Sequence, residues 1–108
     1  MDINKIILIG RCSNEPVIKK TKSGKVAEFG LATNRFYYKK NGEKKSVVKY
    51  HDIVAWNKLA DVVEKYIVKG KTIYIEGRTE ADIYEDNGVK IKRDIVVAEV
   101  IQLIKDNQ

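Results

Sequence analysis

The sequence predicts a small all-β domain that contains one α-helix, and three observations lead to this fold class. Most of the chain falls into extended segments rich in β-branched and aromatic residues. Turn formers such as Asn41-Gly42 and Asn87-Gly88 separate these segments. A single segment carries the helical period. With 108 residues the chain has the length of one domain, residues 1–108, with one modest core.

Before the helix, we expect strands over residues 3–12, 17–20, 25–38 and 46–56. The first ends at the turn formers Ser13, Asn14 and Pro16. The second leads into a hairpin-like turn in which Gly24 is able to take a positive φ. In the third strand the core candidates are Val26, Phe29, Leu31 and Ala32.

The helix follows from apolar residues that recur on one face, which are Leu59, Val62, Val63, Tyr66 and Ile67. Asn57 is placed to cap its start and Gly70 to end it. Strands return over residues 71–84 and 89–104. Counting the long strands, the order is three strands, one helix and two strands. This is the order of the OB-fold, a five-stranded Greek-key barrel with one α-helix between strands 3 and 4. The competing SH3-like barrel has no comparable helix.

Composition favours a polyanionic partner, because 21 Lys and Arg residues outnumber 15 Asp and Glu residues and give a formal charge of +6. The lone Cys12 has no partner for an internal disulfide, which fits a reducing compartment such as the cytoplasm. The start of the chain does not resemble a signal peptide, and no apolar stretch has the length of a membrane span. We therefore expect no membrane association.

Four aromatic residues in strand-like segments, Tyr37, Tyr50, Trp56 and Tyr84, each have a lysine or arginine nearby. An aromatic ring stacks on any nucleobase, while basic side chains contact the phosphates, so this combination is typical of proteins that bind single-stranded nucleic acid without reading its sequence. The alternative is that these rings fill the core.

Basic residues also cluster on the hairpin between residues 35 and 49, where Glu43 is the one acidic residue. Lysine-rich hairpin tips also serve solubility and oppose edge-to-edge pairing, which is the alternative explanation. A second basic loop near Lys20 and the interleaved aromatics favour a nucleic-acid groove. The expected phosphate-contacting residues are Arg35, Lys39, Lys40, Lys44, Lys45 and Lys49.

No pattern indicates an enzyme, a cofactor or a metal site. Gly70-Lys71-Thr72 matches the end of a phosphate-binding P-loop, but Lys65 stands where that motif needs glycine, and the tripeptide follows a helix instead of opening one. His51 and Cys12 are too few for a structural zinc site, which has four ligands.

The chain resembles the bacterial-type single-stranded DNA-binding proteins over about residues 3–104. The matching stretches are residues 4–11 (NKIILIGR) with Pro16, Phe29 with residues 31–34 (LATN), residues 50–54 (YHDIV), residues 58–60 (KLA) with Tyr66, and residues 69–70 (KG) with residues 73–78 (IYIEGR). The resemblance implies an OB-fold homotetramer that coats and protects single-stranded DNA in replication, recombination and repair, in the cytoplasm of a bacterium or a phage-infected host.

The resemblance also assigns roles to residues. It places base stacking on Tyr37, Tyr50, Trp56 and Tyr84, with tyrosine at positions where the family often has tryptophan. It places subunit contacts on the first strand and a histidine, so the expected interface residues are Ile3, Lys5, Ile7, Ile9 and His51.

Family members usually continue into a flexible linker and an acidic tip that recruits replication and repair proteins, whereas this sequence stops at Gln108 without an acidic C-terminal tail. We expect contact with such proteins only if the full gene product carries that tail. Two other functions remain open. One is an adaptor resembling primosomal replication protein N, and the other is an RNA-binding OB domain of the cold-shock or translation type.

Overall fold

The computed structural model describes residues 1–105; the end of the chain, where an acidic tail would follow, lies outside the described residues. It contains six strands and one helix. Their bounds are β1 Ile6–Cys12, β2 Val17–Thr21, β3 Gly24–Tyr38, β4 Lys44–Trp56, α1 Lys58–Tyr66, β5 Thr72–Asp86 and β6 Val89–Leu103. None of the described residues belongs to a helix that is long and apolar enough to cross a membrane.

Five strands form a closed ring. β1 pairs with β5 and β3, β3 with β4, β4 in parallel with β6, and β6 with β5. β2 continues the line of β1 along β3, since Cys12 pairs with Leu31 and Val17 with Glu28. The break at residues 13–16 thus divides one barrel strand into two segments. This ring, with its helix before the last two strands, confirms the OB-fold.

Side chains at alternate positions of the strands point inward and fill the barrel. Leu31, Ile53, Ile73 and Ile75 are fully buried in its core, and α1 adds Val63 at one end. Of the expected core residues in the third strand, Val26, Phe29 and Leu31 are buried, but Ala32 is only half-buried. On α1, Tyr66 is exposed although it falls on the apolar face of the sequence pattern.

Both predicted helix ends are wrong in detail. Asn57 makes no side-chain capping bond, because its φ is 54° and its Oδ1 accepts the backbone N–H of Lys25 at 3.3 Å instead. The helix ends at Tyr66, before Gly70. Gly70 has a φ of 93° and its N–H donates to the Cys12 carbonyl at 2.8 Å, so it serves the turn into β5.

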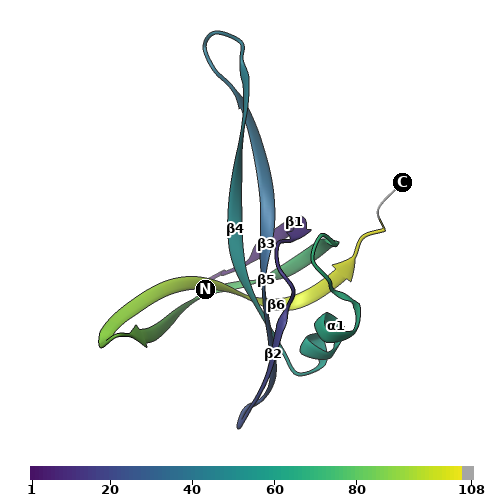
Figure 1. The fold of residues 1–108 in the computed structure, drawn as a ribbon, viewed down its shortest axis with the longest axis vertical. Coiled ribbons are helices and arrows are strands. Elements are labelled where there is room, and N and C mark those ends of the chain that lie inside the picture. Colours follow the sequence, from purple (N-terminus) through teal and green to yellow (C-terminus); the bar gives the residue numbers. More distant parts are fainter. Residues whose placement is uncertain (106–108) are drawn as a thin grey trace.

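Two long hairpins leave the barrel in different directions (Figure 1). One joins β3 to β4 and the other joins β5 to β6. The second turns at Asn87 and Gly88, whose φ values of 52° and 79° match the turn that Asn-Gly pairs favour. The hairpins carry most of the residues that the sequence singles out.

Candidate nucleic-acid interface

The four aromatic residues named from the sequence lie outside the core. Their exposed fractions are 39% for Tyr37, 67% for Tyr50, 37% for Trp56 and 44% for Tyr84. The alternative that these rings fill the barrel is therefore wrong. An exposed ring on a strand has at least one face that a flat ligand is able to reach.

Tyr50 and Trp56 lie on the outer side of the barrel wall formed by β3 and β4. They pair with Ala32 and Val26, and even-numbered positions of both strands share this side. A hollow of about 400 Å³ lies between Trp56 and Asp82 of β5. Tyr84 follows Asp82 by two residues, on the same side of its hairpin. Trp56 thus lines this hollow, and Tyr50 lines a separate hollow with Asp52 of β4 and Arg93 of β6.

Tyr37 occupies the opposite local face of the β3–β4 ribbon. Tyr37 pairs with Lys45, while Tyr50 pairs with Ala32. Tyr37 and Ala32 are an odd number of residues apart on β3, so their side chains leave the strand on opposite faces. A two-stranded ribbon twists strongly along its length. A nucleic-acid strand that contacts both tyrosines must follow this twist around the hairpin.

The basic residues of this hairpin are exposed around its tip and arms, except Lys45, which is half-buried. Arg35 stacks over the ring of Tyr37 at 5.6 Å, and Lys45 forms an ion pair with Glu43 at 3.0 Å. Within residues 1–105, no carboxylate lies at ion-pair distance from the other four lysines of the set, which are Lys39, Lys40, Lys44 and Lys49. Their charge is therefore less neutralised than that of Lys45.

Two further aromatics at this tip, Phe36 and Tyr38, were not assigned a role from the sequence. Phe36 is 59% exposed and lies on the Tyr50 side of the ribbon. The sequence feature that could have identified Phe36 is its place in a hairpin arm. This arm extends beyond the barrel, where no core exists to bury an apolar ring.

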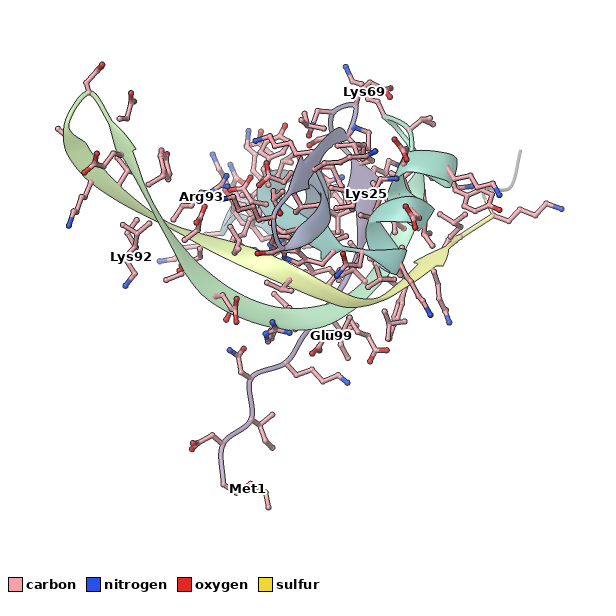
Figure 2. All side chains as sticks on the ribbon, turned by 90° about the horizontal axis from the view of Figure 1, so that it is seen from below. Met1, Lys25, Lys69, Lys92, Arg93 and Glu99 are labelled. Carbon is pink, nitrogen blue, oxygen red and sulfur yellow. The ribbon has the colours of Figure 1, made fainter. Side chains whose placement is uncertain are left out.

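Arg93 of β6 is a second residue that sequence reasoning missed. Its Nε donates to Asp82 at 3.0 Å, and its guanidinium carbon lies 5.6 Å from the Tyr84 ring centroid. The Arg93 side chain lies beside the β5–β6 hairpin, on the side that faces the barrel (Figure 2). Its terminal nitrogens reach toward Glu28 of β3 and Asp52 of β4. These carboxylates, Asp82 foremost, raise the pKa of Arg93 above its already high ordinary value. Only the three-dimensional pairing of strands brings these groups together.

The residues expected at a subunit interface divide into two groups. Ile7, Ile9 and His51 line one hollow of about 490 Å³, together with Arg35 and Lys49 of the expected phosphate contacts. Ile7 and Ile9 point outward from β1, with exposed fractions of 55% and 57%. From Ile6 to Gly10, β1 pairs with β5 alone among the described strands, so its other edge is open to a partner.

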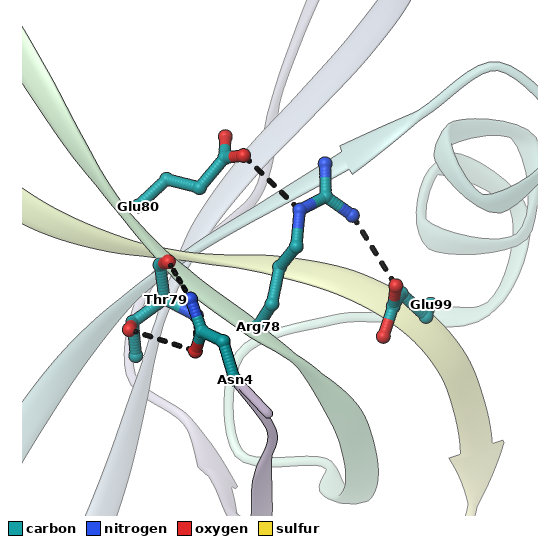
Figure 3. A network of polar contacts seen from close by, with 5 residues as sticks. All are labelled: Asn4, Arg78, Thr79, Glu80 and Glu99. Atoms are coloured by element: carbon teal, nitrogen blue, oxygen red, sulfur yellow. Dashed lines mark hydrogen bonds and ion pairs between the residues drawn. The ribbon is translucent and has the colours of Figure 1, made fainter. Parts of the chain in front are cut away.

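Ile3 and Lys5 lie away from that hollow, on the segment before β1. Lys5 forms an ion pair with Glu76 of β5 at 3.1 Å. Between these two residues, the Asn4 amide donates to the Thr79 carbonyl at 2.8 Å, and Asn4 Oδ1 accepts from the Thr79 hydroxyl at 3.2 Å (Figure 3). On the same strand, Arg78 bonds Glu80 and Glu99 (Figure 3). This segment is therefore anchored to β5.

His51 is half-buried, and its Nε2 lies 3.0 Å from the Thr33 hydroxyl. Burial lowers its pKa below 6.5, the nearby Lys49 lowers it further, and Asp52 partly opposes both effects. The neutral imidazole is thus favoured at neutral pH, as suits a packing role.

The other residue weighed as a metal ligand, Cys12, is buried in the core, and its thiol donates to the Asn14 carbonyl at 2.9 Å. Burial raises the pKa of the Cys12 thiol, which favours the unreactive protonated form. Among the described residues, no group of three or more His, Cys, Asp or Glu side chains is placed to hold a metal ion.

Several known proteins are similar to this chain in sequence. Single-stranded DNA-binding protein 1 of Chlorobaculum tepidum is 41% identical over 86 residues, which cover 79% of this chain and 53% of that protein. The single-stranded DNA-binding protein of Aquifex aeolicus is 36% identical over 103 residues, which cover 94% of this chain and 70% of that protein. The chain thus spans about half to two thirds of the length of these relatives.

A solved structure agrees with the fold. The Plasmodium falciparum SSB in its complex with ssDNA superposes with a TM-score of 0.87 at 32% identity, covering 97% of each chain. The family model described as the single-strand binding protein family matches residues 3–104, nearly the whole barrel with both hairpins. The chain therefore belongs to the single-strand binding protein family.

Proposed function

We propose that this chain binds and protects single-stranded DNA without regard to sequence over most of its contact surface, and that it performs no catalysis. The observation that carries the proposal is the set of exposed rings on β4 and β5, Tyr50, Trp56 and Tyr84, together with the basic tip of the β3–β4 hairpin. The names of the relatives and the ssDNA in the Plasmodium complex support it.

The mechanism divides the work between two kinds of side chain. The rings of Tyr37, Tyr50, Trp56 and Tyr84 stack on unpaired bases, whose faces are hidden in a duplex. The phosphates are contacted by Arg35, Lys39, Lys40, Lys44, Lys45 and Lys49. Stacking therefore provides the preference for single strands, and the charges provide affinity that depends on salt.

The direct test is equilibrium binding of matched single-stranded DNA, RNA and duplex DNA at one stated salt concentration. Trp56 is the sole tryptophan, so its fluorescence should be quenched when oligo(dT) binds. The Trp56→Phe variant should bind without this signal and report through a labelled oligonucleotide. Equal binding of duplex and single strands would contradict the proposal, and stronger binding of RNA would favour the RNA-binding alternative.

For assembly, we propose a homotetramer in which the open edge of β1 and the apolar pair Ile7 and Ile9 meet other subunits, with His51 close by. One OB barrel contacts only ~4–16 nucleotides, so several are needed to hold a long strand. Ile3 and Lys5 extend this surface toward β5. Light scattering tests the state, and a stable dimer would favour the adaptor function.

In the cell, this binding would serve DNA replication, recombination and repair in the cytoplasm of a bacterium or a phage-infected host. Contacts with replication and repair proteins would require an acidic tail in the full gene product. Pull-down of such proteins with the natural full-length product, compared with residues 1–108, tests this dependence.

A further inference from the structure

A hollow with both polar and apolar walls lies directly beside Tyr50, one of the proposed stacking residues. Its volume is about 250 Å³. Besides Tyr50, its wall includes Ser13, Asn14, Glu28, Gly30, Asp52 and Arg93. Tyr50 and Asp52 are two residues apart on β4, so their side chains leave the strand on the same side. A base stacked on Tyr50 would have one edge over this hollow.

At Gly30 the wall of the hollow is formed by the backbone itself, because glycine has no side chain. Gly30 pairs directly with Asp52 across β3 and β4. A Cβ atom at Gly30 would overlap the Ser13 hydroxyl and lie 2.9 Å from Asn14 Oδ1. The Ser13-Asn14 loop is therefore packed against bare backbone, where it is fixed by the Gly30 N–H, which donates to Asn14 Oδ1 at 2.8 Å.

Arg93 presents hydrogen-bond donors to this hollow. Its Nε is engaged by Asp82, but its Nη1 and Nη2 lie 3.9 Å from Asp52 and 3.7 Å from Glu28, beyond hydrogen-bond distance. Asp82 thus fixes the guanidinium through Nε, while the N–H groups of Nη1 and Nη2 remain available to donate hydrogen bonds to a ligand.

The carboxylates make the hollow unfavourable for a phosphate. Asp52, Glu28 and Asp82 surround a single guanidinium, and within residues 1–105 only Glu28 has a second ion-pair partner, Lys19 at 3.5 Å. An approaching phosphate would meet more negative than positive charge. A base edge is neutral and carries donors as well as acceptors, so it is able to use both kinds of group.

Guanine matches this combination best. Its O6 and N7 are adjacent acceptors for an arginine fork. Its N1–H and N2 amino group are adjacent donors for a carboxylate. Thymine offers one N–H between two carbonyls and uses the carboxylate only once. We propose that the hollow is a base-edge site that favours guanine at one position of the bound strand, with Arg93 and Asp52 as its reading groups. This inference rests on the proposed binding of single-stranded DNA.

The experiment compares an all-thymine oligonucleotide with the same oligonucleotide that carries one central guanine, since a single guanine cannot form a quadruplex. The native protein should bind the guanine-containing strand about tenfold more tightly, within the range of one good bidentate base contact. Replacing that guanine by hypoxanthine, which lacks the N2 amino group, or by 7-deazaguanine, which lacks N7, should each reduce the preference.

Two variants link the preference to the residues. Asp52→Ala, which removes the acceptor, should abolish the difference between guanine and hypoxanthine, and Arg93→Met, which removes the donors, should abolish the difference between guanine and 7-deazaguanine. The preference is a ratio measured within each variant, so a general change in affinity cancels. Equal affinity of the native protein for the two strands, or a preference that both variants retain in full, would overturn this inference alone. Failure to bind the all-thymine strand would overturn the proposed function as well.

Discussion

Phe36 lies beneath the ammonium group of Lys44, whose Nζ atom is 4.5 Å from the ring centroid. The two residues come from opposite arms of the β3–β4 hairpin, near its tip. Phe36 is 59% exposed there, and burial in a core does not account for its position. A ring next to a positive charge is the arrangement that a stacked base and its phosphate require.

We expect Phe36→Ala to weaken binding of oligo(dT) by about 1–3 kcal/mol, the usual value for loss of one stacked base. The matched control is Tyr66→Ala on α1, which removes an exposed ring that Lys65 covers at 5.5 Å. Titration of both variants at one salt concentration checks the prediction. Equal small losses in the two variants would remove Phe36 from the DNA path.

The basic hairpin tip should set the salt dependence of binding. For single strands, log K falls with log salt with a slope of about −0.7 per phosphate neutralised. The triple variant with alanine at Lys39, Lys40 and Lys44 should therefore flatten the slope, whereas Lys45→Ala should change it less because Glu43 already pairs with Lys45.

The control for charge alone is the triple variant with alanine at Lys58, Lys65 and Lys69, on or just after α1. It removes the same net charge from the helix side of the barrel. If both triple variants change the slope equally, the tip has no special role.

The fold was largely predictable from the sequence because its signals are local. The Asn87-Gly88 turn and the alternation around Leu31 follow from backbone geometry and strand period. The helix ends were not predictable in the same way. Asn57 has the right residue type for a cap, but a tertiary hydrogen bond to Lys25 of β3 takes its side chain.

The site was predictable in part. Composition identified the exposed rings, since Tyr50 and Trp56 stand among basic residues. It did not identify Arg93, because its partners Glu28, Asp52 and Asp82 are far apart in sequence and meet only after the strands pair. Nor did it show that Arg35 and Lys49 share a hollow with Ile7 and Ile9, which places them beside the proposed subunit interface as well.

Replacing Ile9 by lysine should disrupt assembly. Its side chain points outward from β1 and is 57% exposed in the single chain, so a charge there should leave the barrel folded but oppose burial against another subunit. Light scattering should show a smaller species than the native protein. Val68→Lys is the control, since Val68 is similarly exposed, at 56%, beyond the end of α1. Assembly that survives Ile9→Lys and Ile7→Lys would place the interface elsewhere.

Gly77→Ala should destabilise the barrel. Gly77 lies at the register shift between β5 and β6, and a Cβ atom there would overlap the Val97 carbonyl oxygen and lie 3.2 Å from the Ala98 Cα. Both neighbours are backbone, so relief requires the strands to move. Overpacking of this kind typically costs about 1–3 kcal/mol. Denaturant titration measures the loss of stability. The control is Ala81→Gly at an exposed position of the same strand, which measures the effect of exchanging alanine and glycine where no backbone is crowded.

His51 should make the protein less stable as the pH falls below neutral. Its folded-state pKa is lowered from 6.5, mainly by burial and then by Lys49, so the unfolded chain binds a proton more readily than the folded one. Stability is then constant above the unfolded-state value and decreases as pH falls from about 6.5 toward the lower folded-state pKa.

Replacing His51 by glutamine, which is able to keep a hydrogen bond to Thr33, should remove this part of the pH dependence. The measurement is the free energy of unfolding of both proteins between neutral pH and mildly acidic pH, at one protein concentration because assembly contributes to stability. The native protein should lose more stability than the variant toward the acidic end, since only the native protein carries a His51 that binds a proton more readily in the unfolded chain. Parallel curves across this range would show that His51 titrates alike in the folded and unfolded chains.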